Sequence, residues 1–345
     1  MAGLSHLYAG ASATKDGGEG GVFRRASSGE AWQHVLKGVD VHALTVDPRN
    51  ADIVYAGTKD GPYRSTDRGE HWERLGFPDR DMQIWSILPD PHDPKTVYAG
   101  GSPVAVYRSD DGGDNFKRMP DPALPDRVRM PFACRVMRFA AHPQRAGELY
   151  ATLEVNGAMR SRDGGESWED CTADLIRLAG EPRLQSRIVS DTTDEGMLDG
   201  HAIATTSADP DGVILAVRMG LFRTNDHGRS WDDMQVGRFS PYTYGRDIRV
   251  SPRDPKTLYA CLSVAANSEA GALFRSDDIG NTWRRFDKVE PRSTVMAVAP
   301  HPRDPNEVHI VARRGQVFGT SDGGASWLAA PLPANARDLY ALACG

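Results

Sequence analysis

Two widely separated sites in the chain carry the same acid–imidazole spacing. Asp40 stands two residues before His42, and Asp199 stands two residues before His201. Residues two apart in a strand face the same side, so each pair would present a carboxylate and an imidazole together. Imidazole and carboxylate suit zinc, manganese or iron, so His42 and His201 could bind a divalent metal. Alternatively, each carboxylate could orient its imidazole as a general base.

Further side chains could bind a substrate beside these pairs. Arg135 and Arg246 could clamp a carboxylate of the substrate, because guanidinium groups bind carboxylates through paired hydrogen bonds. Tyr244 could supply a phenolic acid. The remaining candidate contacts are Trp85, Tyr242 and Asp338. These residues run from position 40 to position 338, so a repeated element must bring them together.

Such an element recurs six times with the pattern S-x-D-x-G-x-x-W. The copies are YRSTDRGEHW at 63–72, YRSDDGGDNF at 107–116, MRSRDGGESW at 159–168, FRTNDHGRSW at 222–231, FRSDDIGNTW at 274–283 and FGTSDGGASW at 318–327. A degenerate seventh copy, FRRASSGEAW, occupies 23–32. Before the copies stand alternating apolar stretches, a proline turn and a second strand, as in HALTVDPRNADIVYAGT. A period in the forties with four strands per unit predicts propeller blades.

The chain ends complete the ring. DLYALACG at the C-terminus reads as an isolated innermost strand, and residues 5–35 supply the three outer strands that lack one. We therefore expect a single all-β domain over 1–345, a seven-bladed β-propeller of four-stranded antiparallel blades. Its last blade is closed by N- and C-terminal strands, which removes a free sheet edge.

Composition narrows the functional classes. The chain has a net charge of −6, which argues against nucleic-acid binding, and no apolar run long enough for a membrane helix. We expect no nucleic-acid or membrane partner. The sequence as given starts without a signal peptide and has four well-separated cysteines, so we expect a cytoplasmic location.

The repeat resembles the Asp-box, or BNR, motif, and this resemblance covers nearly the whole chain. Similar propellers occur in sortilin-type receptors, the photosystem II assembly factor family, xyloglucanases and sialidases. The Ile-Pro segment and Tyr–Glu pair of sialidases are absent, so we do not expect a sialidase. The resemblance implies that a xyloglucanase uses two propellers, and only one is expected here, which argues against a glycoside hydrolase. The repeated Asp can accept hydrogen bonds within its own turn, which indicates a scaffold role rather than a calcium site.

Function is expected where the repetition breaks. Three connections are expanded on one face, at 117–134, 169–200 and 232–245, and residues 173–179 could form a short helix there. Aligning the innermost strands gives one level of seven residues and a second level two residues earlier. The first level is His42, Trp85, Met137, His201, Arg246, Met296 and Tyr340, and the second is Asp40, Gln83, Arg135, Asp199, Tyr244, Thr294 and Asp338.

From these two levels we predict a hydrolase or lyase that acts on a small anionic or polar ligand at the channel mouth. His42 or His201 would be the base, Asp40 and Asp199 would orient it or help bind a metal, and Tyr244 would assist. A second hypothesis is a non-catalytic interaction or assembly-factor propeller that docks a protein through Arg127, Arg129 and Arg135. A third is that the polar side chains only pair with one another at a solvated rim.

Overall fold

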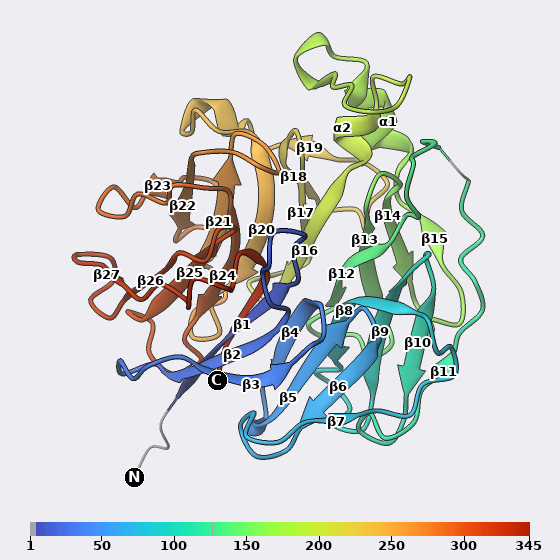
Figure 1. Ribbon diagram of the computed structural model, residues 1–345. Helices are drawn as coiled ribbons and strands as arrows, with labels where there is room; N and C mark the ends of the chain where they lie inside the picture. The colour runs from blue at the N-terminus through green and yellow to red at the C-terminus, as the bar shows by residue number, and fades with distance from the viewer. Residues whose placement is uncertain (1–4, 126) are drawn as a thin grey trace.

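The computed structural model describes residues 5–125 and 127–345, and it forms a ring of seven four-stranded antiparallel sheets (Figure 1). The predicted seven-bladed β-propeller is therefore confirmed. Each innermost strand contacts that of the next blade around the whole ring, and β28 contacts β4.

Blades 1 to 6 follow the chain, and each runs from its innermost strand outward. Blade 1 is β4 (Val41–Asp47), β5 (Asn50–Thr58), β6 (Gly61–Ser65) and β7 (Glu73–Arg74). Blade 2 is β8 (Gln83–Pro89), β9 (Val97–Ser102), β10 (Val106–Ser109) and β11 (Lys117–Arg118). Blade 3 is β12 (Val136–Ala141), β13 (Leu149–Leu153), β14 (Gly157–Ser161) and β15 (Glu169–Asp170).

The remaining blades follow the same order. Blade 4 is β16 (Gly200–Thr206), β17 (Asp209–Val217), β18 (Gly220–Thr224) and β19 (Asp232–Asp233). Blade 5 is β20 (Tyr244–Val250), β21 (Leu258–Ser263), β22 (Gly271–Ser276) and β23 (Arg284–Arg285). Blade 6 is β24 (Val295–Pro300), β25 (Val308–Ala312), β26 (Val317–Thr320) and β27 (Leu328–Ala329).

The closing blade joins both chain ends in one sheet. It consists of β28 (Asp338–Cys344), β1 (His6–Ser12), β2 (Gly21–Ala26) and β3 (Gln33–Lys37). β1 pairs antiparallel with β2 on one side and with β28 on the other. In Figure 1 the blue N-terminal strands accordingly lie beside the red end of the chain. Without this pairing two sheet edges would be left open.

The repeated Asp holds its own turn together, as the sequence predicts. Ser109 Oγ donates to Asp111 Oδ1 at 2.6 Å, and the Asn115 backbone N–H donates to the same oxygen at 2.9 Å. Asn115 Nδ2 donates to Asp111 Oδ2 at 2.9 Å. Hydrogen bonds from Ser109 and Asn115 lower the pKa of Asp111 to about 2. Gly113 takes a φ of +98°, which a side chain would disfavour. Both carboxylate oxygens are thus used inside the turn, which favours a scaffold role.

The long connections start slightly later than the sequence suggests. Their first two residues form the outer strands β11, β15 and β19, because each continues the blade before leaving it. The second connection contains α1 (Ala173–Ala179), η1 (Pro182–Leu184) and α2 (Glu195–Leu198), and the third contains η2 (Val236–Arg238). The helix predicted over 173–179 is confirmed. α1 and α2 project at the top of the view in Figure 1.

A mixed apolar cluster anchors this second connection to the blades. Leu175 and Met197 are fully buried in one cluster with Leu215 of β17, and Val128 of the first connection joins them. The two connections therefore pack on one another. In the described part of the chain, no helix has the length and apolarity needed to cross a bilayer.

Candidate functional site

Every innermost strand carries an irregularity at the same level of the ring. In β20, Gly245 pairs with Leu262 and Asp247 pairs with Cys261, so Arg246 has no partner in the ladder. A β-bulge of this kind takes one residue out of pairing and redirects its side chain. The residues skipped in the seven strands are His42, Trp85, Met137, His201, Arg246, Met296 and Tyr340. They are the seven residues that alignment of the sequence places on one level, here called the bulge ring.

The bulge ring surrounds a channel that its own side chains fill. Six of its seven members line one cavity, which also contains Arg138 and Arg249. The cavity has a volume of about 30 Å³, which is room for about one water molecule. A larger ligand would therefore have to bind outside this cavity. The polar side chains described next gather at the end of the channel where the innermost strands begin. We call this end the channel mouth.

On one side of the channel mouth, aromatic rings and a guanidinium form a stack. The His42 imidazole lies on the Trp85 indole, with centroids 3.9 Å apart and planes at 12°. The Arg135 guanidinium lies 3.9 Å from the centroid of the same indole, and the edge of Tyr340 meets it at 5.6 Å. Burial, then the positive charge of Arg135, lower the pKa of His42 to about 3. His42 is neutral at ordinary pH.

On the opposite side, Asp199, His201 and Tyr244 form a hydrogen-bonded chain. His201 Nδ1 donates to the Gly245 carbonyl at 2.8 Å, and Nε2 lies 3.1 Å from the Tyr244 hydroxyl. Asp199 Oδ2 lies 3.4 Å from the same Nε2. Burial raises the pKa of Asp199, but the charges of His201 and Arg218 outweigh it and hold this pKa at about 2. Asp199 therefore stays ionised inside the protein.

Four charged residues that sequence reasoning missed also reach the channel mouth. Each is the first residue after the second strand of its blade. Its backbone N–H donates to the carbonyl of the residue that stands two positions before the bulge-ring residue of the same blade. They are Lys59, Glu154, Arg218 and Arg313. The sequence signal was available, since these positions follow the repeated second strand yet differ between blades, but only the innermost strands were aligned.

These turn residues pair with the second predicted level. Glu154 forms an ion pair with Arg135, and Arg218 lies 2.9 Å from Asp199 Oδ2. Burial raises the pKa of Glu154, and the neighbouring charge of Arg135 only partly offsets this. The other two pairs are Lys59 with Asp40 at 4.0 Å and Arg313 with Asp338 at 2.8 Å.

Arg246 of the bulge ring differs from these paired charged residues. It is 8% exposed, and its Nε is buried without a hydrogen-bond partner. Within residues 5–125 and 127–345, no hydrogen bond or ion pair reaches its guanidinium, although Glu154 and Tyr340 are near enough to feel its charge. A buried guanidinium without a partner is costly, and an anion bound at the channel mouth would satisfy it.

The structure separates several residues that the sequence groups together. Asp40 accepts the Ala13 N–H at 2.6 Å and faces Lys59, and no ion pair joins it to His42 among the described residues. Tyr242 packs in the core cluster between blades 4 and 5 instead of lining the channel. His42 and His201 occupy opposite sides, and neither belongs to a group of three or more potential metal ligands among the described residues. Metal binding by this pair remains a prediction.

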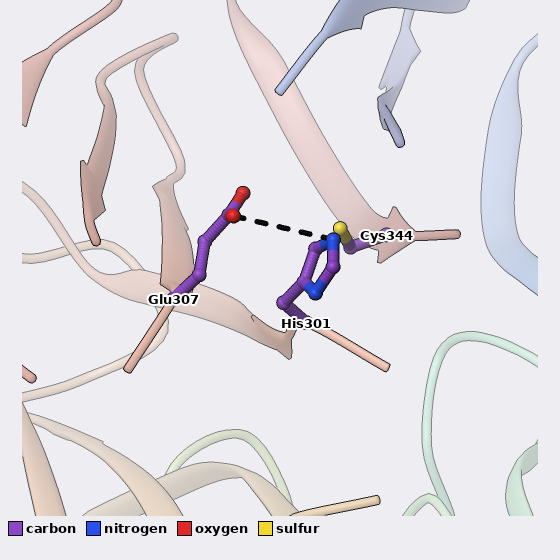
Figure 2. Close-up of side chains that lie close together, drawn as sticks. All are labelled: His301, Glu307 and Cys344. Atoms are coloured by element: carbon purple, nitrogen blue, oxygen red, sulfur yellow. Dashed lines mark ion pairs between the residues drawn. The ribbon is translucent and has the colours of Figure 1, made fainter. Parts of the chain in front are cut away.

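One cluster elsewhere has the residue types of a metal site. His301, Glu307 and Cys344, which lie close together in Figure 2, have potential ligand atoms within 4.8 Å of one another. His301 Nδ1, however, accepts the backbone N–H groups of Arg303 and Asp304 at 3.1 and 2.9 Å. Its proton therefore resides on Nε2, the atom that would face a metal, which is 2.7 Å from Ser5 Oγ. His301 caps its proline turn.

Comparisons with known proteins agree with this architecture. Residues 60–192 match the sequence model of a family described as sortilin, neurotensin receptor 3. The chain is 26% identical over 221 residues to a xyloglucanase from a Paenibacillus species, covering 53% of the chain and 20% of that protein. It is 26% identical over 243 residues to a probable oligoxyloglucan-reducing end-specific xyloglucanase of Neosartorya fischeri, covering 66% and 27%. The match thus spans about a quarter or less of these relatives.

Solved structures show the same fold at low identity. The GH74 xyloglucanase from Xanthomonas campestris superposes with a TM-score of 0.65 at 20% identity, covering 85% of this chain and 45% of that one. YCF48 from Cyanidioschyzon merolae gives 0.59 at 14% identity and covers 90% of both chains. The chain is thus a seven-bladed β-propeller similar to sortilin, xyloglucanase and YCF48 propellers, and the resemblance seen in the sequence is confirmed.

Proposed function

We propose that the protein is a hydrolase that acts on a small anionic or polar substrate at the channel mouth. The observation that carries this proposal is a pair of carboxyl groups with opposite pKa shifts: Glu154 is raised and Asp199 is lowered to about 2. Two carboxyl groups whose pKa values are shifted in opposite directions are typical of acid and base partners in hydrolysis. The curated relatives are themselves named as xyloglucanases, which are hydrolases.

Each group has a role in the proposed reaction. Arg246 binds the anionic or polar group of the substrate, because its guanidinium has no partner among the described residues. Glu154 is the proposed general acid that donates a proton to the leaving group, because burial raises its pKa despite the charge of Arg135. The attacking water loses a proton to the Tyr244 oxygen while the Tyr244 hydroxyl proton passes to His201 Nε2, 3.1 Å away. Asp199 then stabilises the imidazolium.

A panel of chromogenic esters, phosphate esters, glucosides and glucuronides tests this proposal. We expect turnover of at least one anionic substrate, and a fall in kcat of about 100-fold or more for Glu154→Gln. Glu166→Gln, which changes an exposed carboxylate in a repeat turn, is the matched control and should retain activity. The absence of turnover on the whole panel, or equal rates for Glu154→Gln and wild type, would refute a hydrolase at this site.

A second candidate is a protein-docking propeller. Its supporting observation is the exposure of Phe132, Ile188 and Val189 on the first two long connections, with Val189 61% exposed. Exposed apolar side chains on binding loops are typical of interaction surfaces. One structural neighbour is YCF48 bound to a D1 peptide, with a TM-score of 0.54 at 15% identity.

The docking candidate has its own test. Pull-downs with the wild type should recover one stoichiometric partner, and Ile188→Ser with Val189→Ser should lose it. Glu154→Gln should retain that partner, because its side chain belongs to the channel mouth. Equal recovery by the wild type and the double variant would count against docking through these residues.

A further inference from the structure

Neighbouring blades are held together by a repeated tyrosine–arginine clasp. In the closing blade, the Tyr8 hydroxyl and Arg24 Nη1 both donate to the carbonyl of Arg68 in blade 1, each at 2.9 Å. Arg68 directly follows the repeated Asp, so the clasp grips the turn of the next blade. Blade 1 holds blade 2 in the same way, by Tyr55 and Arg64 to the Gly112 carbonyl at 2.8 and 2.9 Å.

The seam between blade 6 and the closing blade has lost both halves of this arrangement. β25 carries His309 at the tyrosine position, and its ladder partner in β26 is Gly319 in place of arginine. The turn opposite is the degenerate seventh copy, in which Arg25 replaces the capping Ser and Ser27 replaces the Asp. The replaced residues of blade 6 therefore face the replaced residues of the closing blade.

A pocket of about 290 Å³ lies at this seam. Its lining includes Arg25, Ser27, Ser28, His309 and Gly319, with apolar atoms from Leu7 and Leu328. The blades remain joined beside it, because Trp32 Nε1 of the closing blade donates to the Ala330 carbonyl at 2.9 Å. The seam slot, as we call this pocket, is therefore a cavity in a closed ring.

The cation in the seam slot lacks a counter-charge. Arg25 Nε donates to the Ala26 carbonyl at 3.2 Å, but no carboxylate of the described residues lies within 4 Å of its guanidinium. Burial lowers the pKa of Arg25. The acidic group in the lining, Glu307, is already engaged, since its Oε1 lies 2.8 Å from His309 Nε2. Ser28 adds a hydroxyl group to the lining of the slot.

We propose that the seam slot binds a small ligand through an oxyanion group, carboxylate or phosphate, that accepts hydrogen bonds from Arg25. Guanidinium groups bind both oxyanions through two parallel N–H donors. Leu7 and Leu328 offer apolar walls to the rest of the ligand. This slot is separate from the channel mouth, so it does not depend on the hydrolase proposal.

Titration with inorganic phosphate and with acetate tests the slot, using thermal unfolding and calorimetry at constant ionic strength with chloride as reference. We expect saturable binding of phosphate, acetate or both at concentrations up to about 20 mM, with a rise in Tm. Arg25→Gln should weaken this binding by about 10-fold or more, because it removes a charge-assisted contact. Arg229→Gln changes an exposed arginine elsewhere and should bind as the wild type does.

Rebuilding the clasp provides a second, independent variant. His309→Tyr combined with Gly319→Arg restores the tyrosine–arginine ladder pair found in the closing blade and in blades 1, 2, 3 and 5. Both changes are needed because a Cβ at Gly319 would lie 2.5 Å from His309 Nδ1. This double variant should fill the slot and abolish oxyanion binding. Binding of phosphate alone would identify a phosphate site, and binding of acetate alone a carboxylate site. No saturable binding by the wild type, or unchanged affinity in Arg25→Gln, would overturn the proposal.

Discussion

The His42 imidazole lies flat on the Trp85 indole, with ring centroids 3.9 Å apart. The opposite face of this indole is covered by the Arg135 guanidinium. Neither face of Trp85 is therefore open to a substrate, and His42 has a buried Nδ1 without a hydrogen-bond partner. This stack closes the channel on the side of blades 1 and 2.

The neutral state of His42 predicts how stability depends on pH. Its folded pKa of about 3 lies below the unfolded value of 6.5, so the unfolded chain binds the extra proton first. The free energy of unfolding should therefore fall as pH falls from 6.5 towards 3, by about 2 kcal/mol at pH 5 from this residue. His42→Phe keeps the stacking and removes the titrating group. Urea unfolding at pH 7 and pH 5 should show a smaller loss in this variant; an equal loss would contradict a neutral His42.

Asp199 should lower stability in the same direction as His42, but in a more acidic pH range. Its pKa is lowered from 3.8 to about 2, so its contribution is complete above pH 3.8 and disappears as pH falls through 2. Asp199→Asn removes the charge that faces His201 and Arg218, and should cost about 3 to 5 kcal/mol at pH 7. Denaturant unfolding measures this loss. Asp287→Asn, whose carboxylate side chain is 82% exposed, is the control and should change stability little.

Substitution of Arg246 should change substrate binding and folding stability in different ways. Its unpaired guanidinium costs folding free energy, so Arg246→Met should be as stable as the wild type or more stable. The same change should lower kcat/KM for an anionic substrate by roughly 10- to 100-fold, because a charge-assisted hydrogen bond is lost. Thermal unfolding and steady-state kinetics measure the two effects. A strongly destabilised variant would show instead that Arg246 has a structural partner.

The repeated turns should tolerate loss of one Asp without loss of the fold. Asp111→Ala removes the acceptor for Ser109 and Asn115, and should cost about 1 to 2 kcal/mol. Exposure at the turn keeps the cost at the low end of this range. Chemical unfolding provides the measurement, and calcium or a chelator should not change the result. A calcium-dependent difference between variant and wild type would argue for a metal site in the turn.

The sequence predicts the architecture because the repeat encodes it. Asp111 and Gly113 recur in every full copy, and such local turn chemistry depends on only a few neighbouring residues. The levels of the ring also follow from repetition, since Arg246 and its equivalents align without any knowledge of the β-bulges. Both predictions rest on residues that stand at one fixed place in each unit.

The pairing at the channel mouth could not be predicted in the same way. Arg135 forms an ion pair with Glu154, which follows β13, and Asp199 forms an ion pair with Arg218, which follows β17. These partners come from the second strand of the same blade, whereas sequence reasoning paired residues along one innermost strand. Which acid meets which base depends on side-chain geometry across strands, and the Asp40–His42 spacing carries no information about it.

The bulge ring has a consequence for protein design. A residue that pairs with no neighbouring strand can be exchanged without breaking a ladder, so seven codons can be randomised together on an unchanged scaffold. Each library member would present a different set of seven side chains, from aromatic to cationic, around the channel axis. Selection from such a library would recruit new ligands by altering chemistry at fixed coordinates, with the surrounding blades left as they are.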